Sequence, residues 1–148
     1  MTTEHTPGAG PLPGRPKAYR FDQMPVELLT PGLSRSGIRS DGSLVTINWF
    51  EPGFRSSGQH SHPFDQLSFV LSGTLEFFVG DEVYVLEAPA VLHIPGDVPH
   101  GAQPVGDERV LNIDIFAPVR DDYRALTAYQ DAEHADRSPS LQPRQNKE

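Results

Sequence analysis

Three histidines and one glutamine have the spacing of a single metal site. His60 and His62 form a His-x-His pair, Gln66 follows shortly after, and His100 comes directly after a second segment, 95–99, that is rich in proline and glycine. Because successive side chains of a strand point to opposite faces, a His-x-His pair in a strand presents both rings on one face. Imidazole suits zinc, manganese, iron, copper and nickel, and the oxygen of a neutral glutamine can also coordinate. The pattern predicts one metal centre built from two segments that the fold brings together.

The other histidines are weaker candidates. His93 lies just before Pro95 and could either join the site or pack elsewhere. His5 and His134 lie in polar terminal segments and are not expected to take part. A lone histidine is usually a surface or core residue that is hydrogen-bonded to the backbone. The combination of a His-x-His pair, a glutamine and a distant proline-flanked histidine instead favours a metal site.

The segments that must position these side chains have the pattern of strands. The chain has 148 residues with 15 prolines and 13 glycines, which favours one domain with frequent turns. Runs of β-prone residues bounded by turn residues predict strands at 43–50, 66–71, 74–79, 82–86, 90–94 and 109–116. The segment from Asp121 to Tyr129 is predicted to be a helix, because its first two carboxylates complement the helix dipole. The spacing is typical of an all-β sandwich or barrel with a short C-terminal helix.

The two ends of the chain differ in composition from its middle. Residues 1–20 are rich in proline, glycine and threonine and are predicted to form a flexible N-terminal arm. Residues 131–148 are polar and are predicted to form a disordered C-terminal tail. The folded domain is therefore expected at 21–130.

Composition and charge exclude several classes of partner. The sequence has 12 Lys and Arg against 20 Asp and Glu, which gives a formal net charge of −8. No nucleic-acid partner is expected, because phosphate contacts need clustered basic residues. No membrane partner is expected either, since no apolar run reaches the length of a membrane span and the N-terminus lacks the pattern of a signal peptide. The lack of cysteine fits a reducing compartment, so we expect a cytoplasmic protein that acts on a small-molecule substrate.

The predicted strand at 109–116 has one polar and one aliphatic face. Asn112 and Asp114 share a face, which should meet either solvent or a wet cavity. Asp114 is thus either a reactive group in a cavity or a solvent-facing strand residue. The opposite face is expected to be ordinary core and carries Leu111, Ile113 and Ile115.

Two segments of the chain resemble the two motifs of cupins. The segment from His60 to Gly73 resembles the first motif, His-x-His-x3-Glu-x6-Gly, with Gln66 in place of the usual glutamate. The segment from Pro95 to His100 resembles the second motif, Pro-x-Gly-x2-His, with Asp97 in place of the usual glycine. The resemblance covers Leu44 to Arg120. It implies a cupin double-stranded β-helix, a jelly-roll barrel with the metal inside its mouth, and a homodimer.

The end of the last predicted strand resembles a narrower group of cupins. The run 114–123, Asp-Ile-Phe-Ala-Pro-Val-Arg-Asp-Asp-Tyr, is similar to the ending of pectin-degradation cupins, which convert 4,5-unsaturated galacturonate towards its linear keto form. That resemblance implies three histidines and a glutamine as metal ligands and a catalytic set of Asp114, Phe116 and Arg120. Manganese hydroxynitrile lyases are related cupins with the same ligand types, and the small cupin-type polyketide cyclases form another related branch.

These residues favour a divalent-metal enzyme that acts on a carbonyl compound. A zinc, manganese, nickel or iron ion held by four neutral ligands keeps its full charge and is a strong Lewis acid. Asp114 would then act as general acid or base, and Arg120 would bind a substrate carboxylate, unless it pairs with Asp121 or Asp122 instead. The predicted reaction is an isomerase, lyase or cyclase step on an unsaturated sugar acid or a polyketide-like molecule. A cupin dioxygenase and a non-catalytic ligand-binding cupin are the alternatives.

Overall fold

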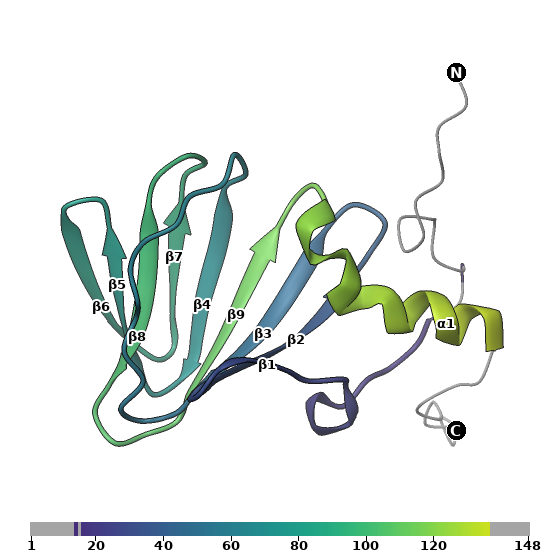
Figure 1. Ribbon diagram of the computed structural model, residues 1–148, viewed down its shortest axis with the longest axis horizontal. Helices are drawn as coiled ribbons and strands as arrows, with labels where there is room; N and C mark the ends of the chain where they lie inside the picture. Colours follow the sequence, from purple (N-terminus) through teal and green to yellow (C-terminus); the bar gives the residue numbers. More distant parts are fainter. Residues whose placement is uncertain (1–13, 15, 137–148) are drawn as a thin grey trace, which may run out of the picture.

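The computed structural model describes residue 14 and residues 16–136, which form two antiparallel sheets (Figure 1). The larger sheet has the order β1-β2-β3-β9-β4-β7, and the smaller sheet has the order β6-β5-β8. The strands are β1 (Glu27–Thr30), β2 (Leu33–Arg39), β3 (Leu44–Phe50), β4 (Gln66–Ser72), β5 (Thr74–Val79), β6 (Glu82–Glu87), β7 (Ala90–Ile94), β8 (His100–Val105) and β9 (Val110–Phe116). The helical elements are η1 (Phe21–Gln23), η2 (Asp121–Thr127) and α1 (Ala128–Asp136). The predicted all-β jelly roll with a short C-terminal helix is confirmed.

The face of the larger sheet that meets the smaller sheet, called the inner face below, carries a band of polar side chains. Thr46 of β3 lies opposite Asp114 of β9, and Asp114 lies opposite Ser68 of β4. Two residues along the strands, Asn48 of β3 lies opposite Asn112 of β9. Because side chains alternate along a strand, all five project from the same face. This polar band crosses the three central strands of the larger sheet.

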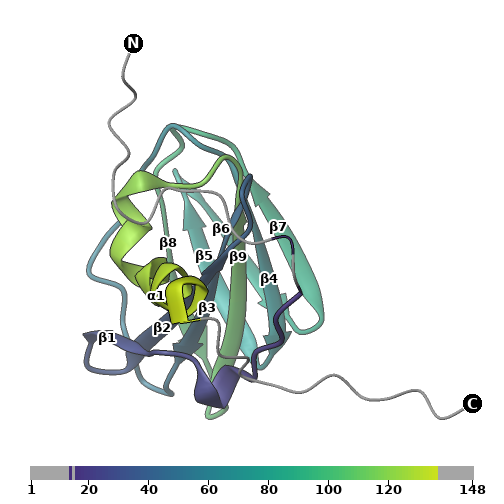
Figure 2. The same ribbon diagram turned by 90° about the vertical axis from the view of Figure 1, so that its right-hand side faces the viewer.

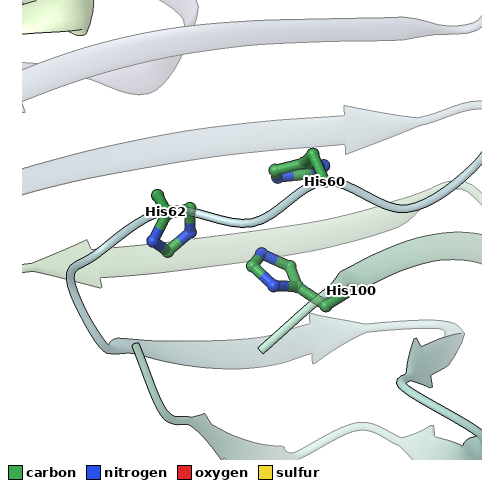
Figure 3. Close-up of side chains that lie close together, drawn as sticks. All are labelled: His60, His62 and His100. Atoms are coloured by element: carbon green, nitrogen blue, oxygen red, sulfur yellow. The ribbon is translucent and has the colours of Figure 1, made fainter. Parts of the chain in front are cut away.

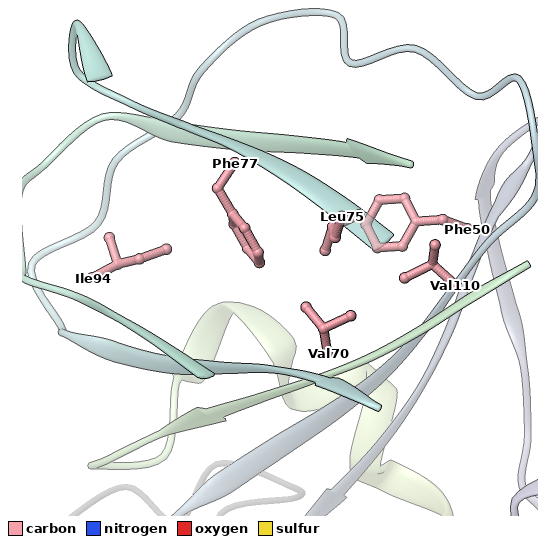
Figure 4. Packing of buried hydrophobic residues seen from close by; sticks show 6 residues of the cluster. All are labelled: Phe50, Val70, Leu75, Phe77, Ile94 and Val110. Carbon is pink, nitrogen blue, oxygen red and sulfur yellow. The ribbon is translucent and has the colours of Figure 1, made fainter. Parts of the chain in front are cut away.

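An apolar core beside the polar band holds the two sheets together. Six buried side chains from both sheets form it: Phe50, Val70, Leu75, Phe77, Ile94 and Val110 (Figure 4). Four of the six have no exposed surface. Burial of each such side chain stabilises the fold by about 1.5–3 kcal/mol. The core thus fixes the sheet-to-sheet packing and leaves the neighbouring polar band available for a site.

The aliphatic side of β9 does not face the core, contrary to the expectation from the sequence. Val110 and Phe116 are buried on the inner face, whereas Leu111, Ile113 and Ile115 are only partly buried on the opposite, outer face. Alternation separates the two faces of a strand but does not say which face turns inward. The inner face of β9 is polar at its centre because it contributes to the polar band.

The strand prediction holds where the sequence is β-prone. Each of the six predicted strands is present, with ends that differ by at most one residue. Strands β1, β2 and β8 are additional. Gly37 in β2, and Gly101 and Pro104 in β8, are residue types that strands usually avoid. Strand β8 is an edge of the smaller sheet, where a proline without an N–H group can be accommodated.

Helical elements η2 and α1 pack beside β2 (Figures 1 and 2). Leu126 approaches Gly37 so closely that a Cβ atom on this glycine would lie 2.6 Å from the leucine Cγ. The Tyr129 hydroxyl donates a hydrogen bond of 2.7 Å to the Gly37 carbonyl. The side-chain amide of Gln130 bonds both the N–H and the carbonyl of Arg39, at 2.8 and 3.0 Å. These bonds satisfy a stretch of the β2 edge that β1 does not reach.

The C-terminal helix also continues past the predicted domain boundary at residue 130. Asp131 accepts a 2.8 Å hydrogen bond from Arg39, and Glu133 accepts one of 2.8 Å from Tyr19. These contacts bring the first residues of the predicted tail and the last residues of the predicted arm into the folded unit. Within those two predicted segments, residues 1–13, 15 and 137–148 lie outside the described residues.

Candidate metal centre

His60, His62 and His100 come together at the mouth between the two sheets (Figure 3). One ring nitrogen of each lies within 4.8 Å of the others. His62 and His100 are buried, whereas His60 is exposed. The rings point toward one another, and His100 is the first residue of β8. The two distant segments singled out by the sequence thus meet in space.

The His-x-His pair reaches this geometry from a loop and not from a strand. His60 makes a single bridge to His100, in which each backbone N–H donates to the carbonyl of the other residue at 2.9 and 2.8 Å. Two residues further on, the carbonyl of His62 accepts a 2.7 Å hydrogen bond from the N–H of Asp97. The pair therefore lies outside a strand, because only one bridge is formed before the chain turns. Backbone hydrogen bonds between the two ligand loops nevertheless fix their relative position.

The loop before His100 has the residue types that allow it to lie close to the loop that carries His60 and His62. Gly96 lies so near the other loop that a Cβ atom would be 2.4 Å from the Pro63 carbonyl oxygen. Asp97 has a φ of 63°, in the left-handed region. Aspartate tolerates this region better than most residues because its short side chain can hydrogen-bond locally. The structure therefore explains how Asp97 can replace the usual glycine of the second cupin motif.

Hydrogen bonds to the backbone orient the two buried rings. His62 donates from Nδ1 to the Phe64 carbonyl at 2.7 Å, and His100 donates from Nδ1 to the Val98 carbonyl at 2.9 Å. Each bond leaves the Nε2 lone pair free. Histidines that bind a metal usually donate their other ring N–H to a carbonyl or carboxylate in the same way. His100 Nε2 is buried and has no hydrogen-bond partner. A buried nitrogen of this kind fits a metal ligand.

Gln66 completes the set from the first position of β4. Its Oε1 atom lies 2.9 Å from Nε2 of His62. In the tautomer that the Phe64 carbonyl imposes, both atoms present lone pairs to each other and repel. A cation between them removes this repulsion, so the donor chemistry of the four side chains fits a bound metal ion.

Burial and neighbouring groups also favour the neutral form of two of the imidazoles, His60 and His100. Partial removal from water lowers the pKa of His60 to about 4, and the charges of His100, His62 and Arg120 act in the same direction. Burial lowers the pKa of His100 as well, against the opposing effect of the hydrogen bond to the Val98 carbonyl. Neutral imidazole is the form that binds a metal, so the lowered pKa values of His60 and His100 favour metal binding at neutral pH.

Asp114 lies on the inner face, next to the candidate ligands, in a network of hydrogen-bond donors. Its Oδ1 atom accepts a short hydrogen bond from the Ser68 hydroxyl and a longer one of 3.4 Å from Asn112. Its Oδ2 atom accepts a 3.2 Å bond from Asn48. Burial raises the pKa of Asp114, while these donors and the nearby imidazole of His62 oppose that rise. The carboxyl is therefore a partly buried group whose proton affinity is tuned by its surroundings, and not a solvent-facing strand residue.

Arg120 and Phe116 lie at the same end of the inner face. The Arg120 guanidinium lies 4.9 Å from the Phe116 ring centre, and the Phe116 ring lies 5.6 Å from that of His62. Arg120 forms an ion pair with Asp122, one of the two pairings that the sequence predicts as the alternative to binding a substrate carboxylate. Its Nη1 atom is nevertheless buried without a partner, so one edge of the guanidinium remains free to bind an anion.

His93 does not take part in the site. It projects from the outer face of β7, is exposed, and lies 3.2 Å from Asp65. Sequence reasoning missed Asn48 and Ser68, which hold Asp114. The sequence did contain a signal for Asn48. This polar residue alternates with Ile47 and Trp49 in a β-prone run, so it had to lie on the opposite face of the strand from these apolar side chains.

Comparisons with known proteins agree with this fold. The profile of the Cupin domain family matches residues 49–116. KdgF from Halomonas sp. has a TM-score of 0.60 and 26% identity, covering 68% of this chain and 94% of that one. An RmlC-like cupin from Shewanella frigidimarina NCIMB 400 has a TM-score of 0.60 and 26% identity, and the match covers 72% of this chain and 94% of that one.

The chain has the cupin fold, and its residues 49–116 match the Cupin domain family. No curated protein matches its sequence significantly. The matched part contains the four candidate ligands and Asp114, whereas Arg120 follows it. Because Gln66 stands where cupins usually have glutamate, the candidate ligand set has no carboxylate.

Proposed function

We propose that this cupin is a divalent-metal-dependent isomerase, lyase or cyclase that acts on a carbonyl-containing acid. One observation carries the proposal. Gln66 lies opposite Phe116 on the inner face, and Ser68 lies opposite Asp114 in the next row. A candidate metal ligand and a candidate acid/base group therefore project side by side from neighbouring rows of one sheet. A divalent ion held by the three histidines and Gln66 would polarise a carbonyl oxygen as a Lewis acid.

Asp114 is the group that moves the proton. Its two oxygens are held by Ser68 and Asn48, so the carboxyl is oriented before substrate arrives. Burial raises its pKa from that of an ordinary aspartate, which makes the carboxylate a stronger base. We assign to Asp114 the transfer of a proton at the carbon next to the substrate carbonyl.

Arg120 and Phe116 position the substrate. The free Nη1 edge of Arg120 would donate to a substrate carboxylate, and the Phe116 ring separates this guanidinium from His62. Three residues of the polar band, Thr46, Asn48 and Asn112, offer hydrogen bonds to an oxygen-rich molecule. These features support an unsaturated sugar acid over an apolar polyketide, and so does the Asp–Phe–Arg ending that resembles pectin-degradation cupins.

We further propose that the protein is a cytoplasmic homodimer with no nucleic-acid or membrane partner. The outer face of the larger sheet supports the dimer, because its central strands expose aliphatic side chains there, including Leu67 and Leu71 at 41% and 46% exposure. The absence of cysteine supports a reducing compartment. Among the residues that the structure describes, no helix is long and apolar enough to cross a membrane.

Metal content and product analysis together test the proposed function. We expect the purified protein to retain about one divalent ion per chain, and His100→Ala and His60→Ala to lose it, because each removes one of few ligands. His93→Ala is the matched control, since His93 lies on the outer face and should not change metal content. The metal-loaded protein should convert 4,5-unsaturated galacturonate to a ring-opened product, followed by NMR, without oxygen uptake.

Three outcomes would contradict the proposal. Full metal content in both site variants would refute the ligand assignment. Bound iron with substrate-dependent oxygen consumption would identify a dioxygenase instead. Tight binding of the sugar acid without any product would identify a ligand-binding cupin.

A further inference from the structure

Two arginines share one tyrosine ring beside the site. The guanidinium carbon of Arg120 lies 4.2 Å from the ring centre of Tyr123, and that of Arg35 lies 4.4 Å from the same centre. The two carbons therefore cannot be further apart than the sum of these short distances. Like charges this close repel each other when they are shielded from water. An anion that contacts both groups would offset this repulsion.

The register of the larger sheet places Arg35 on the inner face. Arg35 of β2 lies opposite Asn48 of β3, and Asn48 lies opposite Asn112 of β9. Arg35, Asn48 and Asn112 thus form one row across three strands. This row lies two residues along the strands from the row that contains Asp114. Its side chain is only 16% exposed. Arg35 is therefore a largely buried cation at the side of the polar band away from β4.

The two arginines keep unused hydrogen-bond donors. Arg35 donates from Nε to Glu27 at 3.2 Å, and in the described part of the chain no hydrogen bond reaches its terminal nitrogens. Arg120 pairs with Asp122, but its Nη1 atom is buried without a partner. Both carboxylates are about half exposed, at 49% for Glu27 and 56% for Asp122, so they neutralise the more buried arginines incompletely. Spare donors and uncompensated positive charge are the properties of an anion subsite.

We propose that Arg35 is a specificity-determining residue that binds a second carboxylate of the substrate. This inference rests on the proposed function, in which Arg120 binds the first carboxylate beside the metal centre. The site then binds short, oxygen-rich dicarboxylic acids more tightly than monocarboxylic acids such as 4,5-unsaturated galacturonate, which uses only the Arg120 contact. Among the described residues, no other aromatic ring lies against two arginines.

Binding of two matched sugar acids to the metal-loaded protein tests this inference. Galactarate has a carboxylate at both ends, and galacturonate has one. Isothermal titration calorimetry should show that the wild-type protein binds galactarate about tenfold or more tightly, because one additional charge-assisted contact is made. Arg35→Gln should remove this preference and leave the affinity for galacturonate unchanged. Arg120→Gln should weaken the binding of both acids.

Two further variants separate charge from packing. Arg35→Lys keeps the positive charge without the guanidinium fork and should retain part of the preference. Arg55→Gln removes an exposed arginine whose hydrogen bond is to the neighbouring Phe54 carbonyl, and it should change neither affinity. Circular dichroism and thermal melting of each variant establish that it is folded.

Several results would overturn the inference. It is wrong if the wild-type protein shows no preference for galactarate, if Arg35→Gln keeps that preference, or if Arg35→Gln weakens both acids equally. The readout is binding and not turnover, so it is independent of the metal-content test. A galactarate preference that depends on Arg35 would stand even if His100→Ala kept its metal. Loss of metal in His100→Ala would likewise stand if Arg35 had no role in binding.

Discussion

Asp114 is the side chain whose surroundings say most about the chemistry of the site. Its carboxyl oxygens receive only donors, from Ser68, Asn48 and Asn112, which is the arrangement that an ionised carboxylate needs. Burial acts in the opposite direction and raises the pKa of Asp114. The folded protein therefore binds the Asp114 proton more tightly than the unfolded chain does.

This shift predicts how the stability of the protein depends on pH. At a pH between the unfolded and folded pKa values of Asp114, the folded state holds the proton and the unfolded state does not, so stability falls as pH rises through this window. Asp114→Asn removes this titration. The unfolding free energy of the variant minus that of the wild-type protein should therefore increase from pH 4 to pH 8, as measured by urea denaturation in the presence of a chelator.

The same variant should lose turnover by about 10²-fold or more, because an amide cannot exchange the proton. Ser68→Ala is a control that removes one donor to the carboxyl but keeps the titrating group, so its stability should still fall with rising pH. A difference between Asp114→Asn and the wild-type protein that stays constant with pH would show that Asp114 titrates normally.

Residue type and spacing were sufficient to predict the four candidate ligands, because imidazole and amide side chains at these intervals have few other common uses. The sequence could not predict the partners of these groups. Asn48 and Ser68 reach Asp114 from two neighbouring strands, and strand pairing is a property of the whole sheet. Arg35 and Tyr123 meet only because η2 packs on β2.

At the level of elements, the packing of η2 on β2 depends on one glycine. A Cβ atom on Gly37 would lie 2.6 Å from both Cγ and Cδ2 of Leu126, which is too close for either atom. Gly37→Ala should therefore displace η2 and lower the unfolding free energy by about 1–3 kcal/mol, the usual cost of overpacking. Chemical denaturation measures this change.

A double variant tests whether this contact is the cause. Leu126→Ala removes the clashing atoms, so Gly37→Ala should cost much less in that background than in the wild-type protein. Gly42→Ala is the control, because no atom lies within 4 Å of the position of its Cβ, and it should change stability by less than about 0.5 kcal/mol. Equal costs of Gly37→Ala in both backgrounds would rule out the contact with Leu126.

The elements also show where sequence patterns lose their information. Strands with β-branched and aromatic residues were predictable almost to the residue, whereas β2 and β8 were not. Gly37 is needed in β2 for the approach of η2, and Pro104 is tolerated in β8 because that strand is an edge. In both strands, tertiary packing overrides the local preference.

At the level of the whole molecule, the outer face of the larger sheet exposes an uncharged, largely apolar surface. The outward positions of β4 and β9 carry no charged residue, in a chain whose formal net charge is −8. Three aliphatic side chains on this face are more than two fifths exposed: Leu67, Leu71 and Val91. Exposed apolar surface of this kind on a soluble domain usually marks an interface. A second copy presents the same uncharged surface, so an isologous dimer would remove both from water.

A charge introduced on this face should therefore separate the dimer into monomers. We expect wild-type protein to have twice the mass of the chain in light scattering, and Val91→Lys and Leu67→Lys to have the mass of one chain, because a dimer would bury two unpaired ammonium groups.

Val83→Lys is the matched control. Val83 is 54% exposed like Val91, at 51%, but it lies on β6 of the smaller sheet, so this variant should remain dimeric. A monomeric wild-type protein, or dissociation by Val83→Lys alone, would place the interface elsewhere. Metal content should be unchanged in all three variants, because each substituted side chain projects away from the inner face that carries the candidate ligands.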